Sequence, residues 1–213
     1  MQKLIVILAM LMGCAPVGWA QSGNWRPLFN GKDMSGWEHV GPGKFVLEDG
    51  LLKSEGGMGL LWYTREKIGN AKLHVVYKLA AKDTNSGVYV RIPEKPTEPW
   101  MPVNKGNEIQ ILNTGDDAHC TGVVYSFSTA LARPYKPPGE WNTMEITLDG
   151  PRTIVYLNGV KTTDHTQGDP NPPQMHKGDP DRGRRPDVGY IGLQNHDKGS
   201  VVYFREVAVA PLH

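Results

Sequence analysis

The stretch Asn107–Leu112, which reads NEIQIL, alternates polar and apolar residues with the period of a half-buried β-strand. Ile109 and Ile111 are expected to point into a hydrophobic core, and Glu108 and Gln110 are expected to point away from it. Alternate residues of a strand lie about 6.5–7 Å apart on one face. The stretch therefore predicts a carboxylate and an amide side by side on one solvated patch of a sheet.

Two further stretches, Gly87–Ile92 (GVYVRI) and Tyr190–His196 (YIGLQNH), repeat this alternation. Their aliphatic residues are expected to face the core. The residues expected on the opposite faces are Tyr89, Arg91, Tyr190, Gln194 and His196. We interpret the three polar faces as meeting in one groove. The alternative is that they are three ordinary solvent-facing surfaces, which is the default for antiparallel sheets.

The rest of the chain consists of short β-rich runs separated by turn residues. Asp49-Gly50 predicts a hairpin turn between two such runs, and Asn158-Gly159 predicts another turn. The run Val201–Val209 loses its alternation near Arg205-Glu206, which indicates a bulge. Residues 115–138 are expected to be mostly loop, as is the segment 168–187, which contains five prolines. With no amphipathic helix of three turns, the pattern indicates an all-β sandwich or jelly roll forming a single domain over residues 21–213.

The first 20 residues have the pattern of a secretory signal peptide. Lys3 precedes a wholly apolar run from residue 4 to 12, and small residues follow, ending at Ala20. The run is too short for a permanent membrane span, which needs about 20 residues. We therefore expect a periplasmic or secreted protein. The alternative is a lipoprotein anchored through Cys14, because residues 11–14 (LMGC) resemble a lipobox.

Composition excludes several functions for the mature chain. Removal of Lys3 with the signal peptide leaves 22 Lys and Arg residues against 22 Asp and Glu residues. This balance argues against nucleic acid or an anionic membrane as partner, because both select a basic surface. Cys120 is the only cysteine left after cleavage at Ala20, so neither an intrachain disulfide nor a Cys/His zinc site is expected.

The polar residues favour a sugar ligand. Carbohydrate sites combine aromatic platforms with amides, carboxylates and arginine. Candidate platforms are Trp62, Trp100, Tyr89, Tyr125 and Tyr190, whereas Trp37 and Trp141 are expected to be structural. An ordinary glycosidase needs two carboxyl groups, but the strand that carries Glu108 has Gln110 where a second acid would be needed.

A single base suits a different reaction. A sugar oxidised to a 3-ketone has an acidified hydrogen on C2, which one general base could remove before the C1 substituent leaves by elimination. Glu108 and His196 are the candidate base and acid, and Arg91 or Gln194 could hold the enolate oxygen. No cofactor is required. A Ca²⁺ site in the loops is an open alternative, with carboxylates from Asp116, Asp117, Asp179 and Asp181.

An ordered set of short motifs resembles the bacterial 3-keto-disaccharide hydrolase domain family. The matching stretches are Leu28–Asp33, Ser35–Trp37, Asn85–Arg91, Glu108–Leu112, Gly139–Asn142, Leu157–Gly159 and Gly192–His196. The resemblance implies a concanavalin A-like, LamG-like jelly roll of two antiparallel sheets, export from the cytoplasm, and action on keto-sugars or related glycosides.

The resemblance also implies functional positions. It places Arg91, Glu108, Gln110, Gln194 and His196 on the recurrent polar positions of the family. With Glu108 and His196 as catalytic candidates, the expected substrate-binding residues are Arg91, Gln110, Gln194, Tyr125, Tyr89, Trp62 and Asn85. The alternative function is a non-catalytic carbohydrate-binding module, and a third is an interaction domain of an envelope complex. The Pro- and Arg-rich segment 168–187 departs from the family pattern and leaves the size of the substrate open.

Overall fold

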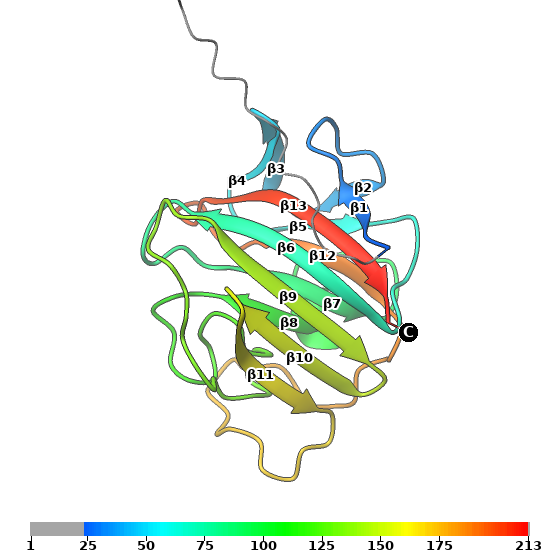
Figure 1. Ribbon diagram of the computed structural model, residues 1–213, viewed down its shortest axis with the longest axis vertical. Helices are drawn as coiled ribbons and strands as arrows, with labels where there is room; N and C mark the ends of the chain where they lie inside the picture. Colours follow the sequence, from blue (N-terminus) through cyan, green and yellow to red (C-terminus); the bar gives the residue numbers. More distant parts are fainter. Residues whose placement is uncertain (1–23, 213) are drawn as a thin grey trace, which may run out of the picture.

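The computed structural model describes residues 24–212, which form two antiparallel β-sheets packed face to face (Figure 1). The larger sheet contains, in spatial order, β11 (Val160–Thr166), β10 (Arg152–Leu157), β9 (Asn142–Asp149), β6 (Ala71–Leu79), β13 (Val202–Pro211), β4 (Leu51–Glu55) and β3 (Lys44–Glu48), with β1 (Arg26–Phe29) also paired to β13. The smaller sheet contains β2 (Trp37–Val40), β5 (Gly59–Tyr63), β12 (Tyr190–Asn195), β7 (Ser86–Ile92) and β8 (Asn107–Ile111).

The main core lies between the two sheets. The alternating side chains of β6 point into it, and so do aliphatic residues of the smaller sheet such as Val88, Ile109 and Leu193. Because both sheets bury an apolar face against each other, the predicted sandwich architecture is confirmed. The inward direction of Ile109 and Ile111 is confirmed as well.

A second apolar cluster covers part of the outer face of the smaller sheet. It contains Leu60, Trp62, Tyr89, Ile92 and Met101. Met101 begins α1 (Met101–Lys105), a short helix with proline in its first turn. The helix follows the Pro-rich segment after β7 and leads directly into β8, so it lies beside the face that carries Glu108.

The predicted turns are present. Asp49 and Gly50 both have positive φ, 51° and 78°, and join β3 to β4, and Asn158 and Gly159 (50° and 81°) join β10 to β11. This is the backbone of the tight hairpin turns that Asp-Gly and Asn-Gly favour.

The other predicted irregularities are present too. The register between β13 and β6 shifts between Phe204 and Glu206, as the sequence predicted. Neither 115–138 nor 168–187 contains a named strand or helix.

No helix among residues 24–212 is long and apolar enough to cross a bilayer. The expected signal peptide and Cys14 lie outside the described residues.

Candidate functional site

A pocket of about 260 Å³ opens on the outer face of the smaller sheet. It is lined by six of the predicted residues, Asn85, Glu108, Gln110, Tyr125, Gln194 and His196, and by Trp100, Val103, Asn104 and Gly178. The sheet contributes β8 and β12, α1 contributes Val103 and Asn104, and loop residues before β7, before α1, after β8, before β12 and after β12 complete the wall. Two of the three stretches predicted to meet, 107–112 and 190–196, therefore share one concave surface, as the strand phase predicted for Glu108, Gln194 and His196, whereas no residue of 87–92 lines it.

Glu108 lies at the base of this pocket and is only 5% exposed. Gly87, on the neighbouring strand, makes room for it, because a Cβ at Gly87 would lie 2.3 Å from Glu108 Oε1. Burial raises the pKa of Glu108 to about 8, and the hydrogen bond with Gln194 opposes this rise only in part. A carboxyl group with a pKa near neutrality can both release and accept a proton under physiological conditions.

Two amides and a phenol surround the Glu108 carboxyl. In the amide orientation that satisfies both of its polar atoms, Gln110 donates to Glu108 Oε1 (2.8 Å) and to the Ser86 carbonyl (3.1 Å). Gln194 Nε2 donates to the Tyr89 hydroxyl at 2.5 Å, and Gln194 Oε1 is buried without a protein partner. Burial and the nearby Glu108 hold the pKa of Tyr89 well above its usual range. The base of the pocket is therefore a network of neutral hydrogen-bonding groups around one ionisable carboxyl.

The pocket mouth is aromatic. Trp100 is 48% exposed, and its ring centroid lies 6.5 Å from that of His196 in an edge-to-face arrangement. Asp197 Oδ2 lies 2.8 Å from His196 Nδ1 and so fixes the orientation of that imidazole. On the opposite wall, burial and the carboxylates of Asp179 and Glu108 raise the pKa of Tyr125 to about 12. Tyr125 therefore keeps its proton and can act as a hydrogen-bond donor.

Residues 24–210 match the family model described as the 3-keto-alpha-glucoside-1,2-lyase-like domain. The chain belongs to this family. A solved structure from Parabacteroides distasonis ATCC 8503, described as a candidate glycosyl hydrolase, is 28% identical with a TM-score of 0.76, over 88% of this chain and 99% of that chain. A second candidate glycosyl hydrolase of that organism is 23% identical with a TM-score of 0.72, over 89% and 94%. The lyase-like domain is thus a carbohydrate-active domain.

More distant structures share only the fold. The carbohydrate-binding module CBM66 of Bacillus subtilis is 12% identical with a TM-score of 0.55, over 82% of this chain and 95% of that chain. Lectin domains are similarly related, and the predicted concanavalin A-like sandwich is confirmed. The comparison with curated proteins gives no significant match.

Arg91 is the main exception to the predicted site, because it does not line the pocket. The Arg91 side chain is fully buried, and its guanidinium donates to three backbone carbonyls, those of Gly150 (2.7 Å), Arg152 (3.2 Å) and Pro186 (3.2 Å). Asp187 lies 3.6 Å away. Arg91 therefore ties the smaller sheet to the β9–β10 turn and to the 168–187 loop, and its predicted role in substrate binding is wrong.

A β-bulge explains this error. Tyr190 pairs with Ile92 whereas Gly192 pairs with Tyr89, so β7 has one more residue than β12 over the same length. Arg91 occupies the irregular position with a φ of 58°. The extra residue reverses the alternation, which turns Arg91 away from the face of Tyr89 and brings Ile92 onto that face, contrary to the prediction.

Two aromatic candidates also lie outside the pocket wall. Trp62 is buried in the outer apolar cluster, where its ring packs edge-to-face on Tyr190 with centroids 4.9 Å apart. Tyr89 is fully buried, does not line the pocket, and accepts a hydrogen bond from Gln194. Neither is a sugar platform as predicted. Trp100, another of the candidate platforms, has the exposed position instead.

The expected solvated patch on β8 is wrong as well. Every residue of β8 is buried, because residues 122–125 hydrogen-bond along its outer edge. The Tyr125 amide donates to the Glu108 carbonyl (2.9 Å), and Gln110 exchanges backbone bonds with Val123 (3.0 Å) and Gly122 (2.9 Å). Glu108 therefore lies on a buried strand, and burial is the cause of its raised pKa.

Sequence reasoning missed Val103, Asn104 and Gly178. Val103 and Asn104 lie on α1, which follows the Pro-rich loop, and Gly178 lies in the 168–187 loop. Neither segment has a periodicity that predicts which residues face the sheet. The proline content of 168–187 was the one signal of function there.

The aspartates considered for Ca²⁺ are not gathered into one oxygen-rich site among the described residues. Asp117 pairs with Arg133 at 2.7 Å, whereas Asp116 and Asp179 both contact His119. The group with metal-ligating potential is Asp116, His119 and His176, whose ligand atoms lie within 4.8 Å of one another.

The raised pKa of Glu108 predicts how stability depends on pH. The folded state favours the protonated carboxyl, so its stabilising effect is complete below the usual pKa of 4.5 and is lost as the pH rises through about 8. This amounts to about 5 kcal/mol, at about 1.36 kcal/mol per pKa unit over the shift from 4.5 to about 8. We expect Glu108→Gln to gain free energy of unfolding relative to the wild type between pH 5 and pH 9 in urea titrations. Parallel pH profiles of the two proteins would contradict this assignment.

Proposed function

We propose that this lyase-like domain cleaves 3-keto-glycosides by removing the proton on C2 and eliminating the C1 substituent, with Glu108 as the base. The observation that carries the proposal is one buried carboxyl of pKa about 8 at the base of a pocket lined by amides and aromatic rings. The membership of the family supports the substrate class.

Each step balances with groups present in the pocket. The Glu108 carboxylate takes the C2 proton, and the C–H electrons form an enolate with its negative charge on the C3 oxygen. The enolate re-forms the ketone, a C1–C2 double bond forms, and the C1–O bond breaks. The departing alkoxide takes a proton from an acid. Addition of water across the double bond then returns a hydrogen to C2 and a hydroxyl to C1, so the sum is hydrolysis.

The hydroxyl of Tyr125 is an uncharged donor in the pocket that suits the enolate oxygen. Both N–H groups of Gln110 are engaged, on Glu108 and on the Ser86 carbonyl, so Gln110 orients the base. Tyr125 takes the place expected for Arg91, which lies elsewhere. His196, oriented by Asp197 at the mouth, is the group we propose as the acid for the leaving oxygen.

The absence of a second carboxyl from the pocket wall favours elimination over ordinary glycoside hydrolysis. Both glycosidase mechanisms use a pair of carboxyl groups across the scissile bond. Among the described residues that line this pocket, Glu108 is the only one with a carboxyl group. A 3-keto group removes the need for the second acid, because it stabilises negative charge at C2 in place of positive charge at C1.

Non-catalytic carbohydrate binding is the second candidate function. Exposed Trp100 beside His196 forms an aromatic rim of the kind on which a sugar ring packs, and that surface requires no ionisable group. Under this hypothesis the raised pKa of Glu108 has no role.

The deciding experiment supplies a 3-keto-disaccharide and its unoxidised parent to the purified protein. We expect release of the reducing sugar from the ketone only, with exchange of the C2 hydrogen for deuterium when the reaction is run in D₂O. Binding of both compounds by calorimetry, without bond cleavage or exchange, would establish the binding module and reject the enzyme. We further propose export by the N-terminal signal peptide, tested by locating the protein in periplasmic and culture fractions.

A further inference from the structure

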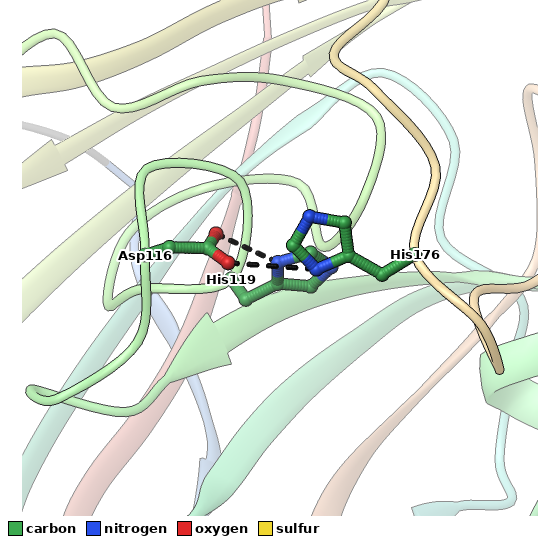
Figure 2. Close-up of side chains that lie close together, drawn as sticks. All are labelled: Asp116, His119 and His176. Atoms are coloured by element: carbon green, nitrogen blue, oxygen red, sulfur yellow. Dashed lines mark hydrogen bonds and ion pairs between the residues drawn. The ribbon is translucent and has the colours of Figure 1, made fainter.

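We propose that Asp116, His119 and His176 form a binding site for one Zn²⁺ ion, or another divalent first-row transition metal, beside the pocket. Figure 2 shows that Asp116 and His119 come from one loop and that His176 reaches them from a separate segment. The proposal concerns metal binding and loop anchoring, so it does not depend on the proposed activity.

The distances suit a transition metal. The two oxygens of the Asp116 carboxylate face different imidazoles: Oδ1 lies 2.7 Å from His119 Nδ1, and Oδ2 lies 3.5 Å from His176 Nδ1. Ligands around a tetrahedral Zn²⁺ ion lie about 3.4 Å apart, given metal–ligand bonds of about 2.0–2.2 Å. The His176 contact already has this spacing, and the His119 contact needs to open by less than an ångström.

Asp179 supplies the outer hydrogen bond that metal-bound histidines have. Its carboxylate, of which the side chain is only 2% exposed, lies 3.0 Å from His119 Nε2. A metal-ligating histidine usually donates its second ring N–H to a carboxylate, which fixes the tautomer and increases the basicity of the other nitrogen. With the proton on Nε2, the lone pair of His119 Nδ1 points toward Asp116.

The same contacts place three ligand groups around one position. Both ring nitrogens of His119 face carboxylate oxygens, Nδ1 that of Asp116 and Nε2 that of Asp179. His176, whose ring centroid lies 4.6 Å from that of His119, adds a third ligand at the same place. One metal ion between Asp116 and the two imidazoles would use all three groups.

The ligand types select the metal. Two imidazoles and one carboxylate favour Zn²⁺ and its first-row neighbours, whereas Ca²⁺ requires six or more oxygens. Fewer than four protein ligands leave a position for water, as in open zinc sites. The buried thiol of Cys120 is not part of the group.

Metal binding at this position would anchor the 168–187 loop over the pocket. His176 belongs to that loop, and Gly178, two residues on, lines the pocket. On the other side of the site, Tyr125 packs edge-to-face on His119 with centroids 4.9 Å apart, and Tyr125 also lines the pocket. The ion would therefore hold together two walls of the pocket that come from different loops.

The test is a Zn²⁺ titration of untagged, chelator-treated protein, followed by calorimetry and by competition with a chromophoric chelator. We expect one Zn²⁺ per chain, a higher Tm with Zn²⁺, and no comparable effect of Ca²⁺. His176→Gln is the main variant, because its side chain is 53% exposed and its loss leaves the fold intact. We expect His176→Gln to weaken Zn²⁺ binding at least tenfold and Asp179→Asn to weaken it about 10–100-fold.

His196→Gln is the matched control. It removes another histidine that contacts an aspartate, at 2.8 Å, but lies outside the group. We expect its Zn²⁺ affinity to equal that of the wild type. The proposal is overturned if the wild type binds no stoichiometric Zn²⁺, if His176→Gln binds as tightly as the wild type, or if His196→Gln loses as much affinity as His176→Gln.

Discussion

Replacement of Glu108 by glutamine is expected to reduce turnover of a 3-keto-glycoside by about 10²–10⁴-fold, the usual contribution of a general base. Glutamine has the shape of the protonated glutamic acid that the folded protein favours at neutral pH, because burial raises the Glu108 pKa to about 8. It fills the space beside Gly87 but cannot accept the C2 proton. We expect the loss in kcat, measured by release of the reducing sugar, with little change in substrate affinity.

Glu38→Gln is the matched control for this experiment. Glu38 lies on β2 of the same sheet, is exposed, and pairs with Lys95 at 3.5 Å, so its replacement should leave turnover unchanged. The wild-type kcat/KM should also rise as the pH increases through about 8, because the base acts as the carboxylate. Full turnover in Glu108→Gln would place the base elsewhere and leave the raised pKa of Glu108 without a catalytic meaning.

Replacement of Arg91 by methionine is expected to lower the free energy of unfolding by about 3–5 kcal/mol, the range for removing one partner of a buried charged contact. The guanidinium donates to the carbonyls of Gly150, Arg152 and Pro186. Methionine fills much of the same volume but donates nothing, so these buried carbonyls lose their partner. The measurement is the midpoint of urea unfolding at constant m.

Arg184→Met separates this effect from the loss of any arginine in the same region. Arg184 is exposed and contacts Asp187 at 3.1 Å, so we expect a change of less than about 1 kcal/mol. A loss of similar size in both variants would mean that general charge removal, rather than the Arg91 contacts, sets stability. A purely destabilised Arg91→Met protein should keep its kcat at low temperature, which a substrate-binding arginine would not allow.

The strand phase of β8 and β12 was predictable from sequence because each strand keeps a period of two along its length. This period was sufficient to bring Glu108, Gln110 and Gln194 to one face. It failed in β7, where one extra residue at Arg91 reverses the alternation. The letters GVYVRI satisfy the regular pattern, and nothing in them reveals that Arg91 has a positive φ. The bulge is set by pairing with β12, which lies about 100 residues further along the chain.

The depth of the pocket was not predictable, because loops create it. Residues 122–125 pair along the edge of β8, and α1 lies beside that strand; these contacts depend on backbone hydrogen bonds rather than on a repeating side-chain pattern. Glu108 was therefore expected on a solvated patch, whereas it is buried. His119 and His176 are far apart in the sequence, and no motif links them. Only the folded chain brings both of them to Asp116.

The backbone bonds between residues 122–125 and β8 also bear on self-association. A free strand edge is a template for pairing with another copy of the chain. The edge of the smaller sheet next to Glu108 is already occupied by the protein's own loop, and the opposite edge is β2. Addition of a neighbouring molecule's strand next to β8 is thereby blocked by the protein itself.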